Sequence, residues 1–261
     1  MTEKKDFLFL HIRALPYFRG FLRAIESAFY QDLDMPGPIL DVGCGDGNFA
    51  ALTFDQPLDV GLDPWHGPIH EAKQYPIYRL LAEADGGHMP FPDGAFATAF
   101  SNSVLEHIPH VQEVLNETSR TLKPGGHFYF CVPNANFTHN LSVARFFDKF
   151  GLKSLGAAYR RFFNTISRHQ HTDMPDVWEK RLTEAGFKIE RWWHYFSPSA
   201  LATLEWGHYW GLPSLIIRKL FGRWIIAPYR WNLFNYNALK KHVDHPLHDS
   251  GAYTFYVTTK L

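Results

Sequence analysis

The sequence predicts an α/β protein in which a mostly parallel sheet is flanked by helices. Along residues 38–133, short apolar runs alternate with helical patterns, which is typical of parallel strands connected by helices. A glycine-rich turn, DVGCGDG at residues 41–47, directly follows the first apolar run. Because ligands of open α/β sheets bind at the carboxyl ends of strands, this turn predicts a binding site.

Seven strands are expected along the chain. They lie at residues 38–42, 58–62, 78–82, 95–100, 127–132, 187–196 and 252–259. Apolar residues at helical spacing predict a helix over residues 107–122, which LKPGG ends. A second helix is predicted over residues 176–185, before Gly186.

Composition limits the classes of partner. The formal net charge is zero, so no overall field attracts nucleic acid or a membrane. Cys44 and Cys131 form no disulfide pattern and fit a reducing compartment. No uncharged apolar run approaches the roughly 18 residues of a spanning helix. We therefore expect a cytoplasmic protein, with peripheral membrane contact left open.

Three types of ligand compete for the glycine-rich turn. A phosphate-binding loop of the Walker type requires Gly-Lys-Ser/Thr, but Gly47 is followed by Asn48. A dinucleotide fingerprint requires GxGxxG, whereas the glycines here give GxGxG. S-adenosylmethionine carries a sulfonium instead of phosphates, and Asp41 directly before the glycines suits a cation. A role in capping the following helix is the alternative for Asp41.

Five motifs in order resemble those of the class I S-adenosylmethionine-dependent methyltransferases, in particular the broad group of quinone-biosynthesis and small-molecule enzymes. They are ILDVGCGDG (39–47), GLDPW (61–65), ADGGHMPFPDGAF (84–96), FSNSVLEHIPH (100–110) and LKPGGHFYFCVPN (122–134). The resemblance covers residues 38–133 and 176–196 and is thin elsewhere. One departure is Ala97 after Phe96, where the family commonly has aspartate. It puts the hydrogen bonding at that strand end in question more than cofactor binding.

The resemblance implies a Rossmann-like, seven-stranded fold with an antiparallel last strand, and S-adenosyl-L-methionine as cofactor. It implies that Asp63 bonds the ribose hydroxyls, that Asp85 and Gly86 meet the adenine, and that Ser101 and Asn102 lie beside the methionine part. The complete set of expected cofactor residues is Asp41, Gly43, Cys44, Gly45, Gly47, Asp63, Asp85, Gly86, Ser101 and Asn102.

Catalysis by such an enzyme consists mainly of holding the acceptor in line with a methyl group that is already activated. A hydroxyl acceptor also needs a general base. His107 is our candidate, because it follows the fourth strand and titrates near neutrality; packing in the first helical turn is the alternative. Glu106 is a weaker candidate, with a solvent-facing charge as the alternative. We expect His139, His169 and His171 to be surface residues.

No metal is expected. His242, His245 and His248 recur at three-residue spacing, but Pro246 interrupts a continuous helix and too few other ligands are near.

About fifty residues separate the sixth and seventh strands, and this insert is rich in aromatic and basic residues. Between Trp206 and Val243 the chain has no acidic residue. The basic and aromatic residues are Arg218, Lys219, Arg223, Arg230, Lys240, Lys241, Trp206, Tyr209, Trp210, Phe221, Trp224, Tyr229 and Trp231. A helical stripe at residues 15–29 is apolar too, with arginines beside it. The two segments could form one lid.

Three explanations of this lid stay open: a helical cap packed on the sheet, an apolar or membrane-facing mouth for a lipid, isoprenoid or aromatic acceptor, and an RNA-binding surface. Zero net charge counts against nucleic acid. We expect methyl transfer to a small apolar acceptor; a non-catalytic binding scaffold or an RNA methyltransferase is the alternative. The oligomeric state is not predicted.

The expected organisation is a single domain over residues 1–261. Its parts are an N-terminal helical cap (1–36), the cofactor-binding core (37–133), a variable substrate-side region (134–175), a helix with strand six (176–196), the aromatic and basic insert (197–250) and the final strand (251–261).

Overall fold

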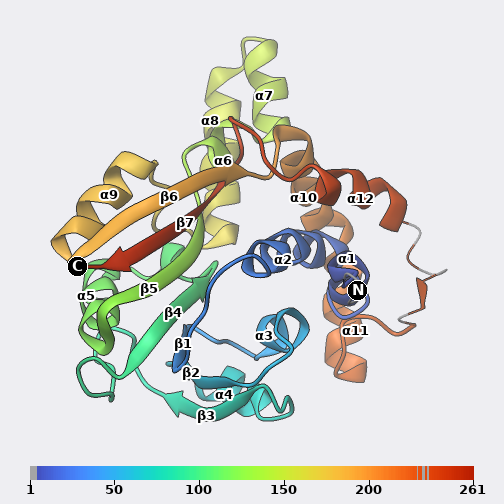
Figure 1. Cartoon of the computed structure of the whole chain (residues 1–261). Helices are drawn as coiled ribbons and strands as arrows, with labels where there is room; N and C mark the ends of the chain where they lie inside the picture. The colour runs from blue at the N-terminus through green and yellow to red at the C-terminus, as the bar shows by residue number, and fades with distance from the viewer. Residues whose placement is uncertain (1–4, 228, 231–232, 234) are drawn as a thin grey trace.

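The computed structural model describes residues 5–227, 229–230, 233 and 235–261, and a seven-stranded sheet runs through this part of the chain (Figure 1). The strand order is β3–β2–β1–β4–β5–β7–β6. The strands are β1 (Ile39–Val42), β2 (Leu58–Asp63), β3 (Tyr78–Glu83), β4 (Phe96–Asn102), β5 (Leu122–Pro133), β6 (Phe187–Tyr195) and β7 (Tyr253–Lys260). β1 to β5 pair in parallel, whereas β7 is antiparallel to both β5 and β6. The predicted fold class is confirmed.

The register of the central strands brings their carboxyl ends to one edge. Asp41 of β1 is paired with Gly61 of β2 and with Phe100 of β4. β4 is buried along most of its length, as expected for a strand covered on both faces. The residues that end β1, β2 and β4 therefore meet at the same edge.

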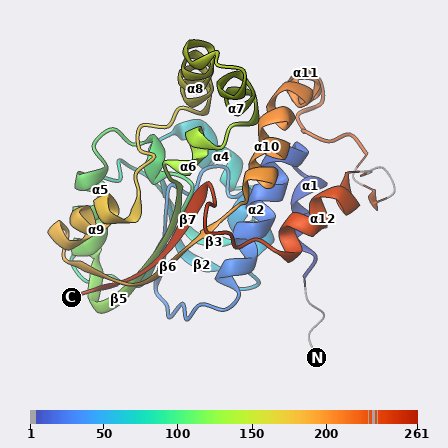
Figure 2. The same cartoon turned by 90° about the horizontal axis from the view of Figure 1, so that it is seen from above.

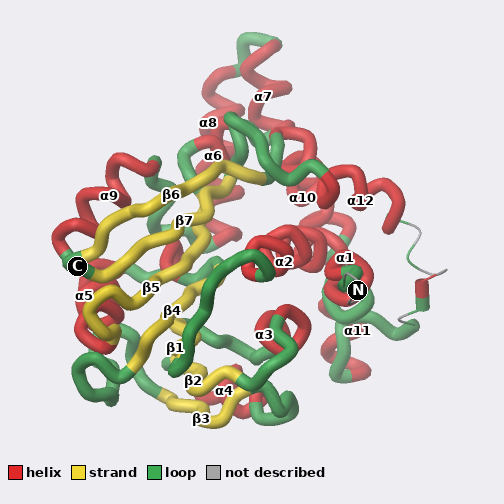
Figure 3. The backbone as a smooth tube through the Cα atoms, viewed as in Figure 1, coloured by secondary structure: helices red, strands yellow, loops and turns green. Residues whose placement is uncertain are grey.

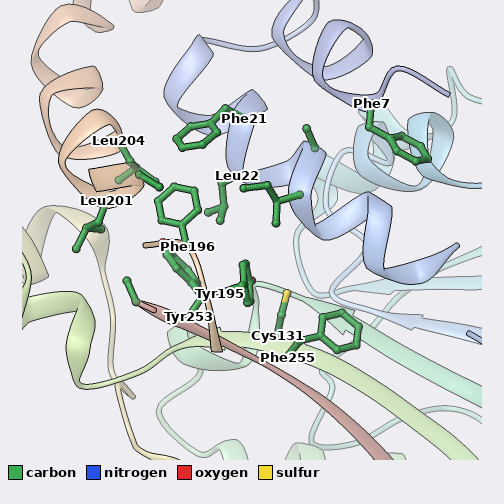
Figure 4. Packing of buried hydrophobic residues seen from close by; sticks show 14 of the residues in the cluster. Phe7, Phe21, Leu22, Cys131, Tyr195, Phe196, Leu201, Leu204, Tyr253 and Phe255 are labelled. Atoms are coloured by element: carbon green, nitrogen blue, oxygen red, sulfur yellow. The ribbon is translucent and has the colours of Figure 1, made fainter. Parts of the chain in front are cut away.

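Helices cover both faces of the sheet (Figures 2 and 3). α5 (Val111–Thr121) and α9 (Pro175–Glu184) pack on one face. α1 (Phe7–Ile12), α2 (Tyr17–Tyr30), α3 (Asn48–Thr53) and α10 (Pro198–Trp210) pack on the other. The remaining α-helices with printed bounds are α4 (His66–Ala72), α6 (Asn136–His139), α7 (Ser142–Lys149), α8 (Lys153–Ser167), α11 (Leu212–Phe221) and α12 (Tyr236–Asp244). Figure 4 shows the core between α2, α10 and the sheet, where Phe21, Leu22, Phe196 and Leu204 lie close together.

The helix predicted over residues 107–122 is α5 (Val111–Thr121), so both predicted bounds are wrong. Residues Leu105–His107 instead form a short 3-10 helix, η1, and Ile108 is extended at ψ 114°. The cause is Pro109, because a residue before proline is disfavoured in the helical region. At the other end, β5 already begins at Leu122.

The segment before the last strand and the N-terminal segment pack together. Gly207 of α10 and Gly211, which caps the end of that helix, lie against Phe18 of α2, where an added Cβ would be 2.3 Å and 2.5 Å from Phe18 atoms. α7 and α8 project from the body as a helical pair (Figure 1). Trp231 of the predicted aromatic set lies outside the described residues. Within the described ranges, no helix is long and apolar enough to cross a bilayer.

Candidate active site

The glycine-rich turn is fixed to the end of β2. The N–H groups of Gly43 and Cys44 both donate to the carbonyl oxygen of Leu62, at 2.8 Å and 2.9 Å. Gly43 has φ +82°, and a Cβ there would be 2.4 Å from a methyl carbon of Val104. Gly45 also has positive φ, at +55°, but open space lies where its Cβ would be. The turn thus presents backbone rather than side chains to the space in front of it.

Asp63 closes this turn. Its Oδ2 accepts a hydrogen bond from the N–H of Gly45 at 3.0 Å, and its Oδ1 accepts one from the N–H of Trp65 at 3.0 Å. Burial raises the pKa of Asp63, and these two hydrogen bonds oppose the rise. Because a carboxylate has about four acceptor positions, it can still accept from a ligand hydroxyl.

Asp41 is the second buried carboxylate at this edge. The hydroxyl of Tyr78 donates to its Oδ2 at 2.6 Å. Burial raises the pKa of Asp41 to about 7, although the Tyr78 hydrogen bond opposes the rise. A cationic ligand beside Asp41 would favour the ionised carboxylate, so the site suits a cation better than a phosphate.

These groups surround a cavity of about 330 Å³, which we call the first cavity. Its wall includes six of the predicted cofactor residues: Asp41, Gly43, Cys44, Gly45, Asp63 and Asn102. Residues outside the predicted cofactor-binding core also line the first cavity: Leu15 between α1 and α2, Arg19 and Arg23 of α2, and Arg218 of α11.

Four predicted cofactor residues lie outside this wall. Gly47 is the N-cap of α3 at φ +74°. Ser101 Oγ donates to the carbonyl oxygen of Val42 at 2.8 Å, which joins β4 to β1. Asp85 is exposed and accepts from the N–H of Gly87 at 2.8 Å. A Cβ at Gly86 would be 3.4 Å from the Val114 methyl groups on α5.

The polar residues of α2 were not among the site residues predicted from the sequence. Arg23 donates to Glu26 Oε2 at 3.1 Å and to the carbonyl oxygen of Asn102 at 2.9 Å. Glu26 is fully buried and also accepts from Asn102, Ser103 and Tyr195. The available signal was a glutamate within an apolar helical stripe, because a buried charge requires partners.

A second cavity of about 390 Å³ adjoins the first, and Arg19 and Arg23 line both. η1, α2, α10 and the loop after α8 contribute most of its wall. The lining residues are Phe18, Arg19, Leu22, Arg23, Ser103, Glu106, His107, Phe137, Ile166, Ser167, Arg168, His169, Leu204, His208 and Tyr253.

Glu106 faces the interior, so the alternative given for it, a solvent-facing charge, is wrong. Only 1% of the residue is exposed, and its Oε2 has no hydrogen-bond partner among the described residues. Its main-chain carbonyl accepts from the N–H groups of Gln170 and His171, which ties η1 to the loop after α8. Burial raises the pKa of Glu106 to about 8.

His107 lies at the end of η1 with one nitrogen engaged. Its Nδ1 is 3.0 Å from the carbonyl oxygen of Arg168. A carbonyl only accepts, so Nδ1 carries the hydrogen and Nε2 is the basic nitrogen of the neutral ring. Nε2 is 3.7 Å from Glu106 Oε1. Burial lowers the pKa of His107.

The other histidines of this region differ in position. His139 is exposed, as expected. His169 is not a surface residue: its Nδ1 is buried without a partner in the described chain, and burial lowers its pKa to about 3. His171 Nε2 lies 2.9 Å from the carbonyl oxygen of Ile108. Where the structure describes the chain, no group of three His, Cys, Asp or Glu residues could hold a metal ion.

A glycine turn closed by the acidic residue of β2, on a seven-stranded sheet with an antiparallel β7, gives the chain the fold of the methyltransferase class. A family model described as methyltransferase domain matches residues 9–203, and the chain belongs to that family.

Two curated relatives and a solved structure are similar to parts or all of the chain. The ubiquinone biosynthesis O-methyltransferase of Pectobacterium carotovorum is 32% identical over 38% of this chain and 44% of its own length. The malonyl-[acyl-carrier protein] O-methyltransferase of Legionella pneumophila is 27% identical over 70% of this chain and 58% of its own. The chain thus spans less than two thirds of either. A SAM-dependent methyltransferase from Thermotoga maritima superimposes with a TM-score of 0.58, covering 93% of this chain and 90% of its own at 15% identity, which shows the fold.

Proposed function

We propose that the protein is an S-adenosylmethionine-dependent methyltransferase that acts on a small acceptor. The observation that carries this proposal is the first cavity, where Asp41, the glycine turn and Asp63 meet at the carboxyl edge of the sheet. When bound, the cofactor supplies an activated methyl group on a sulfonium. Asp63 would accept from the ribose hydroxyls, Asp41 would face the cationic part, and the guanidinium of Arg23 would attract the carboxylate of the methionine part.

The remaining expected residues have supporting roles in this proposal. Ser101 and Gly47 shape the edge through strand pairing and backbone conformation. Asp85 and Gly86 lie in the loop after β3 and do not line the first cavity, and we propose that this loop meets the adenine.

Isothermal titration with S-adenosylmethionine and, separately, with NAD tests the cofactor. We expect binding of the former and none of the latter. Asp63→Ala should weaken S-adenosylmethionine binding by at least about tenfold, because it removes hydrogen bonds to a buried carboxylate. Asp93→Ala, at an exposed position on a distant loop, is the matched control. A folded protein that binds NAD instead would refute the proposal.

We further propose that His107 is the general base for a hydroxyl acceptor in the second cavity. Its Nε2 makes no hydrogen bond within the described chain, its neighbour Glu106 Oε1 being 3.7 Å away, and the Arg168 carbonyl holds the ring orientation. Removal of a general base typically lowers kcat by about 10²–10⁴. His107→Gln should therefore lower single-turnover methylation of a phenol with little change in cofactor affinity, whereas the exposed His139→Gln should not. Equal rates for both variants would remove His107 from this role.

The acceptor, in this proposal, reaches the site beside the insert. Large apolar side chains are exposed on α10 and α11, a set that we call the insert surface: Trp206, Trp210, Leu215, Ile216, Leu220 and Phe221. Arg218, Lys219 and Arg223 accompany it, and such a mixture is typical of interfacial elements. We propose peripheral contact with anionic lipid as the second property of the chain. Trp224 is not part of the insert surface, because its ring packs under the guanidinium of Arg218 at 4.7 Å.

Co-sedimentation with phosphatidylglycerol vesicles tests the insert surface. Trp210→Ala with Phe221→Ala should reduce the bound fraction, whereas Trp192→Ala, an exposed tryptophan on β6, should not. Absence of wild-type binding to these vesicles would refute membrane contact. Methyl transfer to RNA, or cofactor binding without turnover on any acceptor, would support the RNA-methyltransferase or scaffold alternative.

A further inference from the structure

The second cavity carries positive charge that the described protein does not neutralise. Arg23 is paired with Glu26, but neither Arg19 nor Arg168 makes an ion pair with any described carboxylate. The one acidic residue placed on this wall is Glu106. Its raised pKa, of about 8, leaves that carboxyl mainly protonated at neutral pH. The wall therefore has two guanidinium groups, both on exposed residues, that form no ion pair with a described carboxylate, although Asp46 attracts Arg19 from a longer distance.

Arg19 occupies the boundary between the two cavities. It lines both, one helical turn before Arg23 on α2. Its guanidinium lies over the ring of Trp224 at 5.7 Å, which restricts the side chain without neutralising it. An arginine held in this way presents its donors to a ligand, and carboxylate is a group that its planar geometry matches with two hydrogen bonds.

Much of the rest of the wall is apolar or aromatic. The ring of His208 lies 4.4 Å from Phe18 and 5.1 Å from Phe163, and Leu22, Phe137 and Tyr253 line the same space. Three buried polar atoms of lining residues also lack partners among the described residues: Glu106 Oε2, Ser167 Oγ and His169 Nδ1. These three atoms are themselves closed off from solvent, so the apolar and aromatic side chains, and not these atoms, form the surface that a ligand body would meet.

We propose that the second cavity binds an acceptor with an apolar, ring-containing body and one carboxylate, and that Arg19 recognises the carboxylate. This inference rests on the proposed methyltransferase activity and narrows its acceptor from apolar compounds in general to apolar acids.

The test compares 6-hydroxy-2-naphthoate with 6-hydroxy-2-naphthamide, which have the same ring and hydroxyl but differ in charge. Binding is followed by naphthyl fluorescence on protein saturated with S-adenosylhomocysteine. We expect the acid to bind at least about tenfold more tightly, in line with a charge-assisted arginine hydrogen bond. Arg19→Met should reduce the ratio to about twofold or less, and Arg19→Lys should retain part of it. Arg145→Met removes an exposed arginine on α7 and should leave the ratio unchanged.

Titration with S-adenosylhomocysteine separates the two levels of the proposal. If the protein is folded and does not bind this ligand, the proposed function fails. If it binds and the acid and amide bind equally, or neither binds, only the acceptor inference is overturned. The inference is also overturned if Arg19→Met keeps the preference for the acid but loses affinity for S-adenosylhomocysteine, because Arg19 would then serve the cofactor carboxylate.

Discussion

Glu26 is the central residue of the buried polar network between α2, β4 and β6. Its two carboxylate oxygens accept from Arg23, Asn102, Ser103 and Tyr195, so four donors depend on one side chain. The network fixes Arg23 and Asn102, which both line the first cavity. A charge in this position therefore serves both stability and the shape of the site.

Removing Glu26 should destabilise the protein more than removing any surface carboxylate. Glu26→Ala leaves the Arg23 guanidinium without its ion-pair partner, and breaking a buried pair in this way costs about 3–5 kcal/mol. The exposed Glu184→Ala should cost less than about 0.5 kcal/mol. Urea unfolding measures both. Similar unfolding free energies for the two variants would show that the network contributes little.

Glu106 predicts a pH dependence of stability with a definite sign. Its pKa rises from 4.5 to about 8 on folding, mainly through burial; the charge of Glu26 raises it and that of Arg23 lowers it. Between these two values the folded state holds a proton that the unfolded state has lost, so the stability contributed by this group decreases as the pH rises. The largest slope is about 1.4 kcal/mol per pH unit.

Comparison with Glu106→Gln isolates this contribution. Measured by urea unfolding at about pH 5.5 and about pH 7.5, the stability of Glu106→Gln relative to wild type should increase with pH. Glu184→Gln, at an exposed position, should show no such trend. A pH-independent difference for Glu106→Gln would mean that the carboxyl titrates at its ordinary value.

The glycine turn and the strands around it could be predicted because their signals are local. An apolar run, an aspartate and alternating glycines lie within nine residues, and the structure places this turn at the edge of the sheet. The partners of Glu26 could not be predicted in the same way, because Asn102 is 76 residues away and Tyr195 is 169 residues away. The helix error at Ile108 is different, because the effect of Pro109 was visible in the sequence.

Substituting two glycines with positive φ, Gly43 in the turn and Gly125 outside it, distinguishes the cost of backbone strain from the cost of a steric clash. Gly43→Ala must adopt φ +82° and place Cβ against Val104, whereas Gly125→Ala at φ +74° meets nothing within 4 Å. Positive φ costs about 1–2 kcal/mol in both variants. Gly43→Ala should therefore lose more unfolding free energy, and it alone should weaken binding of S-adenosylhomocysteine in isothermal titration. Equal losses would show that Val104 moves aside without consequence.

The whole molecule combines an α/β sheet with a helical cover built from both ends of the chain. α1 and α2 precede the sheet, α10 to α12 enter before its last strand, and they meet over one face (Figures 1 and 2). Sequence composition left a packed cap, an apolar mouth and an RNA surface open for this part. The contacts show that the helical cover has two kinds of surface. Leu201 and Leu204 of α10 pack into the core, whereas Trp210 and Ile216 are exposed.

The contact between α2 and α10 should control the second cavity. A methyl group at Gly207 would lie 2.3 Å from Phe18 Cβ, so Gly207→Ala should force the two helices apart and cost about 1–3 kcal/mol. Because Phe18 and Arg19 line that cavity, 6-hydroxy-2-naphthoate binding should weaken as well. Gly67→Ala, where an added Cβ meets nothing within 4 Å, is the neutral control.

A double-mutant cycle identifies the cause. Phe18→Gly removes both the ring and the Cβ that the added methyl group would meet, so in the Phe18→Gly background the closest contact of Gly207→Ala is gone. The loss caused by Gly207→Ala should then be smaller than in wild type, with a coupling free energy within the roughly 0.5–3 kcal/mol found for residues in contact. Additive losses would mean that α2 and α10 do not depend on this contact. The cover would then be held by its other contacts, such as the ring of Phe21 against that of Phe196 at 4.7 Å.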